Sequence, residues 1–255
     1  LRTGIGHKHS LNFEGGDEFI RYNINVSYNN VAGVMKGSNR ETFGGGFTFS
    51  YRYKSLLFRE QLSLLHNKAD NSPYGSFSDY AKLNPYWRAN NEDGTIREVL
   101  NPVEVAYGSN PVYNPLINKT LNTKNESKYT DITNNFYIEW SVFDDLKATG
   151  RFGFTSRTDE SDIFYPRDHT MFRDIDITDD AYFERGNGKM TTLTTDIALN
   201  YSKTWDKHVM FANAQWSLGE TKSESVTFQA EGFANDKLDY ITHAQQYLAG
   251  GKPSG

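Results

Sequence analysis

Apolar and polar residues alternate along most of the chain, which is the pattern of a β-strand with one apolar and one polar face. The clearest case is the run 19–30, where Ile20, Ile24 and Val26 share one face and Asn25 lies on the other. The same alternation recurs at 43–53, 132–142 and 146–157, and further strands are expected at about 7–14, 55–66, 188–204 and 207–219. The sequence therefore predicts about eight strands, each long enough to cross a bilayer at a tilt.

The connections between these strands alternate between short and long. Short connections are expected at 15–17, 54–55, 144–145 and 205–207, and long ones near 31–39, at about 67–128, at about 159–187 and after Gly219. Outer-membrane barrels keep short turns at one rim and long loops at the other. We therefore predict an all-β fold, an antiparallel transmembrane β-barrel segment with long extracellular loops and an apolar face that points outward.

A soluble β-sandwich is the alternative, because its strands also alternate. Such a domain would be a secreted carbohydrate-binding module. Glu60 favours the alternative, since it falls on the apolar face of its strand between Phe58 and Leu62, where a charge in a lipid-facing band is destabilising. Within a barrel, a β-bulge could redirect this side chain.

Composition narrows the function classes. The hydrophobic fraction is only 37% although aromatic residues make up 15%, and no apolar run approaches a membrane-spanning helix. A net charge of -5 without a cluster of Lys or Arg gives no footprint for nucleic acid. Without cysteine, the chain has no disulfide and no thiolate chemistry. A helical membrane protein and a nucleic-acid-binding protein are therefore not expected.

Several stretches between about residues 7 and 128 carry a family resemblance. They are 9–16, 22–28, 32–38, 80–87 with its Asn84-Pro85-Tyr86 centre, Asp93-Gly94 and Asn114-Pro115-Leu116. In these stretches the chain resembles the SusC/RagA-type TonB-dependent outer-membrane transporters. Beyond residue 128 the similarity is limited to the general strand pattern.

The resemblance implies a bacterial outer-membrane location and a barrel of about 22 strands. It also implies an N-terminal plug that contacts the TonB complex and a SusD-like surface lipoprotein that acts as a lid. The implied activity is energy-dependent import of oligosaccharides or peptides, without a cofactor. Plug, TonB-contacting segment and C-terminal strand are not recognisable here, so residues 1–255 are interpreted as one partial barrel domain embedded in outer-membrane lipid.

Aromatic residues concentrate in the long insert 67–128. The candidate contacts for the ligand or the lid partner are Tyr80, Tyr86, Trp87, Tyr107 and Tyr113, and Tyr74 and Phe77 lie nearby. Aromatic faces stack on sugar rings and on peptide side chains. The alternative is that these rings pack the loop against itself or against the lid. Tyr86 and Trp87 are the first choices for contact.

No catalytic or metal centre stands out. The acidic residues Asp174, Asp176, Asp179 and Asp180 could attract calcium, but their spacing lacks an EF-hand pattern and favours a solvated loop. His7 and His9 could share a face as a metal pair, yet no third ligand is evident. A glycosidase would need two opposed carboxylates, and no such pair is evident. We therefore expect neither an enzyme nor a metalloprotein.

Overall fold

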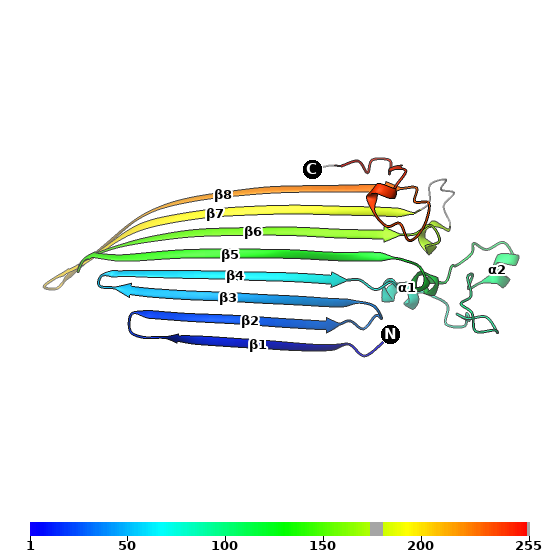
Figure 1. Cartoon of the computed structure of the whole chain (residues 1–255), viewed down its shortest axis with the longest axis horizontal. Helices are drawn as coiled ribbons and strands as arrows, with labels where there is room; N and C mark the ends of the chain where they lie inside the picture. Colours follow the sequence, from blue (N-terminus) through cyan, green and yellow to red (C-terminus); the bar gives the residue numbers. More distant parts are fainter. Residues whose placement is uncertain (174–180, 254–255) are drawn as a thin grey trace.

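The main element of the fold is one antiparallel sheet, and the computed structural model describes residues 1–173 and 181–253. Strands that are neighbours in sequence are neighbours in the sheet, which makes it a simple meander (Figure 1). The strands are β1 (Ile5–Gly16), β2 (Ile20–Ala32), β3 (Asn39–Tyr53), β4 (Leu56–Asp70), β5 (Lys124–Phe143), β6 (Leu146–Tyr165), β7 (Tyr182–Trp205), β8 (His208–Glu231) and the short β9 (Gln246–Tyr247).

Helical turns occur only in the connections of the described chain. They are α1 (Phe77–Ala81), α2 (Pro102–Ala106), and the 3-10 turns η1 (Pro115–Thr120), η2 (Thr170–Phe172) and η3 (Ile241–His243). No helix in the part of the chain that the structure describes is long and apolar enough to cross a membrane. Three of these elements, α1, α2 and η1, belong to the β4–β5 connection, at the right of Figure 1.

The short turns all lie at one rim of the sheet, as predicted. Two-residue turns join β3 to β4 and β7 to β8, and their first residues, Lys54 and Asp206, adopt the left-handed backbone that tight hairpins need. In the β1–β2 turn the Asp17 carboxylate accepts backbone N–H groups of Phe19 and Ile20 at 2.8 and 2.9 Å. The long connections 71–123 and 166–181 leave from the opposite rim (Figure 1).

The strands are longer than the alternation predicted, and they lengthen across the sheet. They grow from 12 residues in β1 to 20 in β5 and β6 and 24 in β7 and β8. The predicted inserts 67–128 and 159–187 are correspondingly too long, and β9 adds a ninth strand to the expected eight. The cause is that Glu220, Lys222 and Glu224 occupy apolar-face positions of β8, so the hydropathy signal ends while the hydrogen-bond ladder continues. Such a stagger between strands is what barrel closure requires.

The sheet is a single layer, which rules out the sandwich alternative. Ile20, Ile24, Phe136 and Phe152 of the apolar face are 38–45% exposed, and no second sheet covers them in the described chain. We call this side of the sheet the apolar face and the opposite side the polar face. The buried cluster formed by Phe164, Phe183, Ala230 and Phe233 sits at the long-loop rim, where residues after β8 fold back.

No bulge redirects Glu60. The β4–β5 register runs without a shift from Leu56 to Asp70, so Glu60 does remain on the apolar face. Its carboxylate accepts a hydrogen bond from the side-chain amide of Asn134, which lies on the same face of β5. Pairing two polar groups offsets part of the cost of placing each in an apolar surrounding. The register irregularity in this part of the sheet lies instead near Ser141 and Phe143, between β5 and β6.

Candidate functional site

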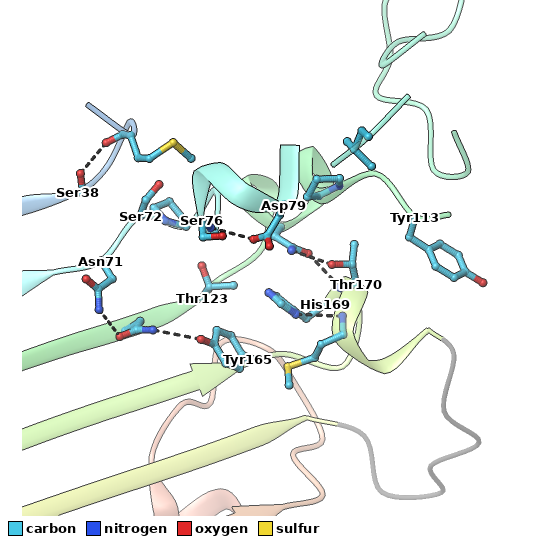
Figure 2. A pocket seen from close by; sticks show the side chains of 18 of the residues that line it. Ser38, Asn71, Ser72, Ser76, Asp79, Tyr113, Thr123, Tyr165, His169 and Thr170 are labelled. Carbon is cyan, nitrogen blue, oxygen red and sulfur yellow. Dashed lines mark hydrogen bonds between the residues drawn. The ribbon is translucent and has the colours of Figure 1, made fainter. Parts of the chain in front are cut away.

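A large cavity opens at the long-loop rim (Figure 2), and Asn125 and Tyr165 in its lining lie on the polar face. Its volume is about 1010 Å³, at the upper end of the range of roughly 300 to 1,000 Å³ that small-molecule sites occupy. Three connections contribute walls: the β2–β3 loop near Met35, the β4–β5 insert at both its start and its end, and the segment after β6 around His169. The cavity therefore exists only where several long loops converge.

A chain of neutral hydrogen-bonding groups forms the floor of this cavity. The side chain of Asn71 donates to Asn125 Oδ1 at 2.8 Å, and Asn125 Nδ2 donates to the Tyr165 hydroxyl at 3.1 Å (Figure 2). These residues sit at the ends of β4, β5 and β6, so the strands themselves fix their spacing. Each group retains free donor or acceptor capacity, which could serve the hydroxyls of a sugar or the amides of a peptide.

Asn118 joins the β4–β5 insert to the segment after β6. Its side chain donates to Thr170 Oγ1 at 2.9 Å and accepts the Thr170 backbone N–H at 3.0 Å. Asn118 is 5% exposed, so both bonds are shielded from water. The turn η1 that carries Asn118 begins at Pro115, and the buried side chain of Asn114 accepts the N–H of Leu116 at 3.1 Å. Pairing across these two loops closes one wall of the cavity.

His169 contributes a neutral ring to the cavity wall. Burial lowers the pKa of its imidazole to about 4, so the ring is uncharged near neutral pH. Its Nδ1 accepts the backbone N–H of Met171 at 3.3 Å, which leaves the proton on Nε2. The ring centroid lies 4.6 Å from that of Tyr165, and this contact fixes both rings.

Asp79 is the one carboxylate among the residues that line this cavity in the described chain. It belongs to α1, and its Oδ2 accepts the backbone N–H of Ser76 at 2.9 Å, which caps the helix start. Apolar side chains, Met35, Leu83 and Met171 among them, cover much of the remaining wall. The arrangement suits a ligand that is largely uncharged, with polar groups facing Asn125 and Tyr165.

Of the five aromatic residues predicted as contacts, the structure places only Tyr113 in the cavity wall. Tyr80 is held inside the insert, because its hydroxyl donates to the Tyr74 carbonyl oxygen at 2.7 Å and burial raises its pKa to about 12. The Tyr80 side chain is therefore engaged inside the insert. The residues that sequence reasoning missed are Asn125, Tyr165 and His169, which lie far along the chain from the insert and carry no local motif.

The remaining three aromatics lie toward the end of the insert that carries α2. Trp87 Nε1 donates to Glu104 of α2 at 3.0 Å, so this ring ties two parts of the loop together. Tyr86 is 91% exposed and Tyr107 is 89% exposed. Neither ring has a ring partner or a side-chain hydrogen bond in the described part of the chain, and both are therefore available to another molecule.

Neither metal-site hypothesis gains support. The His7 and His9 rings lie 5.3 Å apart, but within the described residues no group of three potential ligands forms around them or elsewhere. The acidic residues at 174, 176, 179 and 180 fall outside the described residues. Of the acidic side chains on β6, Glu160 pairs with Lys128 at 2.9 Å and Asp159 with Arg157 at 2.9 Å.

Comparison with known proteins identifies the fold. No family model matches the sequence, and no curated protein matches it. Among solved structures, the RagAB peptide transporter aligns with a TM-score of 0.76 and 14% identity over 98% of this chain. Structures of the RagAB peptide importer in its closed-closed and open-open states also align with a TM-score of 0.76, at 16% identity over 97% of this chain.

The match covers 27–28% of each of those chains, so this chain spans less than a third of their length. At such identity the alignment establishes the fold alone, and the three matched structures are described as a peptide transporter or importer. The chain therefore has the fold of the barrel wall of the RagAB transporter, as its resemblance to the SusC/RagA-type transporters predicted.

Proposed function

We propose that this chain forms part of the wall of a TonB-dependent transporter of the bacterial outer membrane, which imports an oligosaccharide or a peptide. The observation that carries the proposal is a single staggered sheet with one apolar and one polar face, matched over 98% of its length to a peptide transporter. In this arrangement the apolar face meets lipid, the polar face lines the lumen, and the cavity opens to the exterior.

The apolar face supports the membrane location. Large apolar side chains such as Ile24, Phe136, Phe152 and Ile197 are 38–51% exposed on strands β2 to β7. Soluble proteins rarely leave so extended an apolar surface in contact with water. Trp140 and Trp205 lie toward the short-turn rim, where an interfacial aromatic girdle is expected.

The cavity supports a largely uncharged ligand with many hydrogen-bonding groups. Asn71, Asn125 and Tyr165 offer amide and hydroxyl groups, and His169 is neutral. A peptide backbone and a neutral oligosaccharide both satisfy this description. The peptide is the preferred ligand, because the structurally similar proteins are described as a peptide transporter and a peptide importer.

Partners follow from the same proposal. A SusD-like lipoprotein would close over the long-loop rim, and the exposed rings of Tyr86 and Tyr107 are the surface best placed to meet it. Tyrosine is enriched at protein interfaces, since it offers a large ring and a hydroxyl at low conformational cost. Energy would come from the TonB complex through a plug segment.

A Tyr165→Phe variant in the full-length transporter tests the role of the cavity. It removes the hydroxyl that accepts from Asn125, which should raise the KM for uptake of a labelled oligopeptide by about two- to tenfold, given a net hydrogen-bond contribution of roughly 0.5 to 1.5 kcal/mol. Tyr201→Phe is the matched control, because it makes the same change on the apolar face. An equal effect of both variants, or none from Tyr165→Phe, would count against the cavity as the ligand site.

A further inference from the structure

The lining of the cavity at the long-loop rim carries a single charge. Asp79 is its one carboxylate, and neither Lys nor Arg occurs among the lining residues of the described chain. The imidazole of His169 is uncharged near neutral pH, because burial lowers its pKa to about 4. No group in the lining therefore cancels the negative charge of Asp79.

Asp79 is anchored through only one of its two carboxylate oxygens. Its Oδ2 accepts the backbone N–H of Ser76 at 2.9 Å and closes the capping box at the start of α1. Its Oδ1 forms no hydrogen bond, and the carboxylate forms no ion pair, with any residue that the structure describes. Figure 2 shows this side chain beside Ser76 in the cavity lining. One oxygen is therefore held ready to accept from a ligand.

Cations in the neighbouring loops do not take this position. Lys82, three residues further along the chain, forms no ion pair with the carboxylate and does not line the cavity. Lys119 places its ammonium group 5.8 Å from the centre of the Tyr74 ring. Arg173 pairs with Glu98 at 3.1 Å. The unpaired state of the carboxylate is therefore not due to a shortage of cations in this part of the fold.

The surroundings of Asp79 strengthen its attraction for a positive charge. Apolar side chains such as Met35, Leu83 and Met171 cover much of the wall, and walls of low dielectric constant concentrate the field of a charge in a cleft. The chain as a whole carries a net charge of -5, which has the same sign. A ligand that fills the cavity also displaces water that would otherwise screen the interaction. The cavity therefore favours a ligand with one cationic group over a neutral or an anionic one.

A protonated amine is the cation that fits this lining. An ammonium group offers three donors and no acceptor, so it suits a carboxylate oxygen that lacks a partner. A peptide carries such a group at its amino terminus, and a neutral oligosaccharide does not. The Tyr165 hydroxyl accepts from Asn125 at 3.1 Å, which leaves its own proton free for a peptide carbonyl oxygen.

We propose that Asp79 binds the amino-terminal ammonium of a peptide in this cavity and thereby selects peptides with a free amino terminus. Oδ2 continues to cap α1 while Oδ1 accepts from the ammonium group. Neutral oligosaccharides and peptides with a blocked amino terminus lack the group that Asp79 recognises. The inference rests on the proposed function, because it takes the cavity as the ligand site.

Uptake by the full-length transporter of two labelled peptides tests this role. Both consist of the same Ala and Ser residues and end in an amide, but one has a free amino terminus and the other is N-acetylated. Asp79→Asn removes the charge and keeps an oxygen that accepts the Ser76 N–H. Asp93→Asn is the matched control, because Asp93 is an exposed carboxylate of the same insert that accepts the Thr95 N–H at 2.9 Å but does not line the cavity.

In the unaltered transporter we expect the KM of the acetylated peptide to be about three- to tenfold higher than that of the free peptide, as for a partly exposed hydrogen bond between charged groups. The ratio should fall to about one in Asp79→Asn and stay unchanged in Asp93→Asn. Because the readout is a ratio, a variant that merely disturbs α1 would affect both peptides alike.

Three results would overturn the inference: equal KM values in the unaltered transporter, an unchanged ratio in Asp79→Asn, or the same loss of preference in Asp93→Asn. Failure of the proposed function gives a different result. In that case the unaltered protein would take up neither peptide, and the inference would fall with it.

Discussion

Replacing Asn118 by Leu should release the segment after β6 from the β4–β5 insert and open one wall of the cavity. Leucine has a similar shape but no polar atoms, so both hydrogen bonds to Thr170, at 2.9 and 3.0 Å, are lost. The Thr170 N–H then remains shielded without an acceptor. An unsatisfied buried donor costs about 1 to 3 kcal/mol.

A cost of that size shifts the opening equilibrium of the segment by roughly 5- to 150-fold, since 1.4 kcal/mol corresponds to a factor of ten. Hydrogen exchange at the Thr170 amide, followed by mass spectrometry of the peptide that contains η2, measures the shift directly. Asn118→Asp should have a much smaller effect, because its carboxylate still accepts the Thr170 N–H.

The control is Asn101→Leu, which also removes a buried asparagine with two hydrogen bonds in the same insert. The Asn101 side chain donates to the Asn110 carbonyl at 2.9 Å and accepts the Val112 N–H at 2.7 Å, without touching Thr170. Unchanged exchange at Thr170 in Asn118→Leu, or equal acceleration in Asn101→Leu, would refute the assignment of Asn118 as the link between the two loops.

Three further changes probe other parts of the chain. The double change Tyr86→Ala and Tyr107→Ala should weaken binding of the lid lipoprotein at least tenfold in a pull-down or interferometry assay while leaving the barrel folded, because both rings are about 90% exposed. Phe164→Ala should weaken the docking of residues 232–251 by about 3 to 5 kcal/mol, because Phe164 is fully buried, and the result should be faster proteolysis of these residues. Phe152→Ala on the same strand should leave that proteolysis unchanged, because Phe152 is 45% exposed. Burial lowers the pKa of His169 to about 4, so between pH 6.5 and 4 the imidazole binds a proton when the segment is undocked but not when it is docked. Docking of the segment, measured by hydrogen exchange, should therefore weaken as the pH falls through this window. The His169→Phe variant should lose this pH dependence.

The arrangement of the wall could be predicted from the sequence because two independent signals agreed. The alternation of apolar and polar residues predicts the face of the sheet on which side chains such as Ile24 and Asn25 lie. The lengths of the connections predict the rim at which each hairpin turns. Both signals are local, so they do not depend on contacts between distant residues. The strand ends were less predictable. On β8 the outward positions change from Trp216 and Leu218 to Glu220 and Lys222, and the hydropathy pattern is lost although the strand continues.

The cavity could not be predicted in the same way, because its polar floor is assembled from residues far apart in sequence. Asn71, Asn125 and Tyr165 are joined by hydrogen bonds across three strand ends. The aromatic residues of the insert include exposed rings such as Tyr86. The composition could not separate that ring from Trp87, whose indole donates to Glu104 inside the loop. The distinction depends on the tertiary contact alone.

The cavity and the apolar band of the sheet lie at different heights on β4. The last apolar position of the apolar face before the charged end of that strand is Leu64, and the cavity begins at Asn71, seven residues further on. At 3.3 Å per residue this separation is roughly 20 Å along the strand. On the proposed function, a ligand held in the cavity therefore binds outside the lipid-facing band, on the long-loop side of the wall.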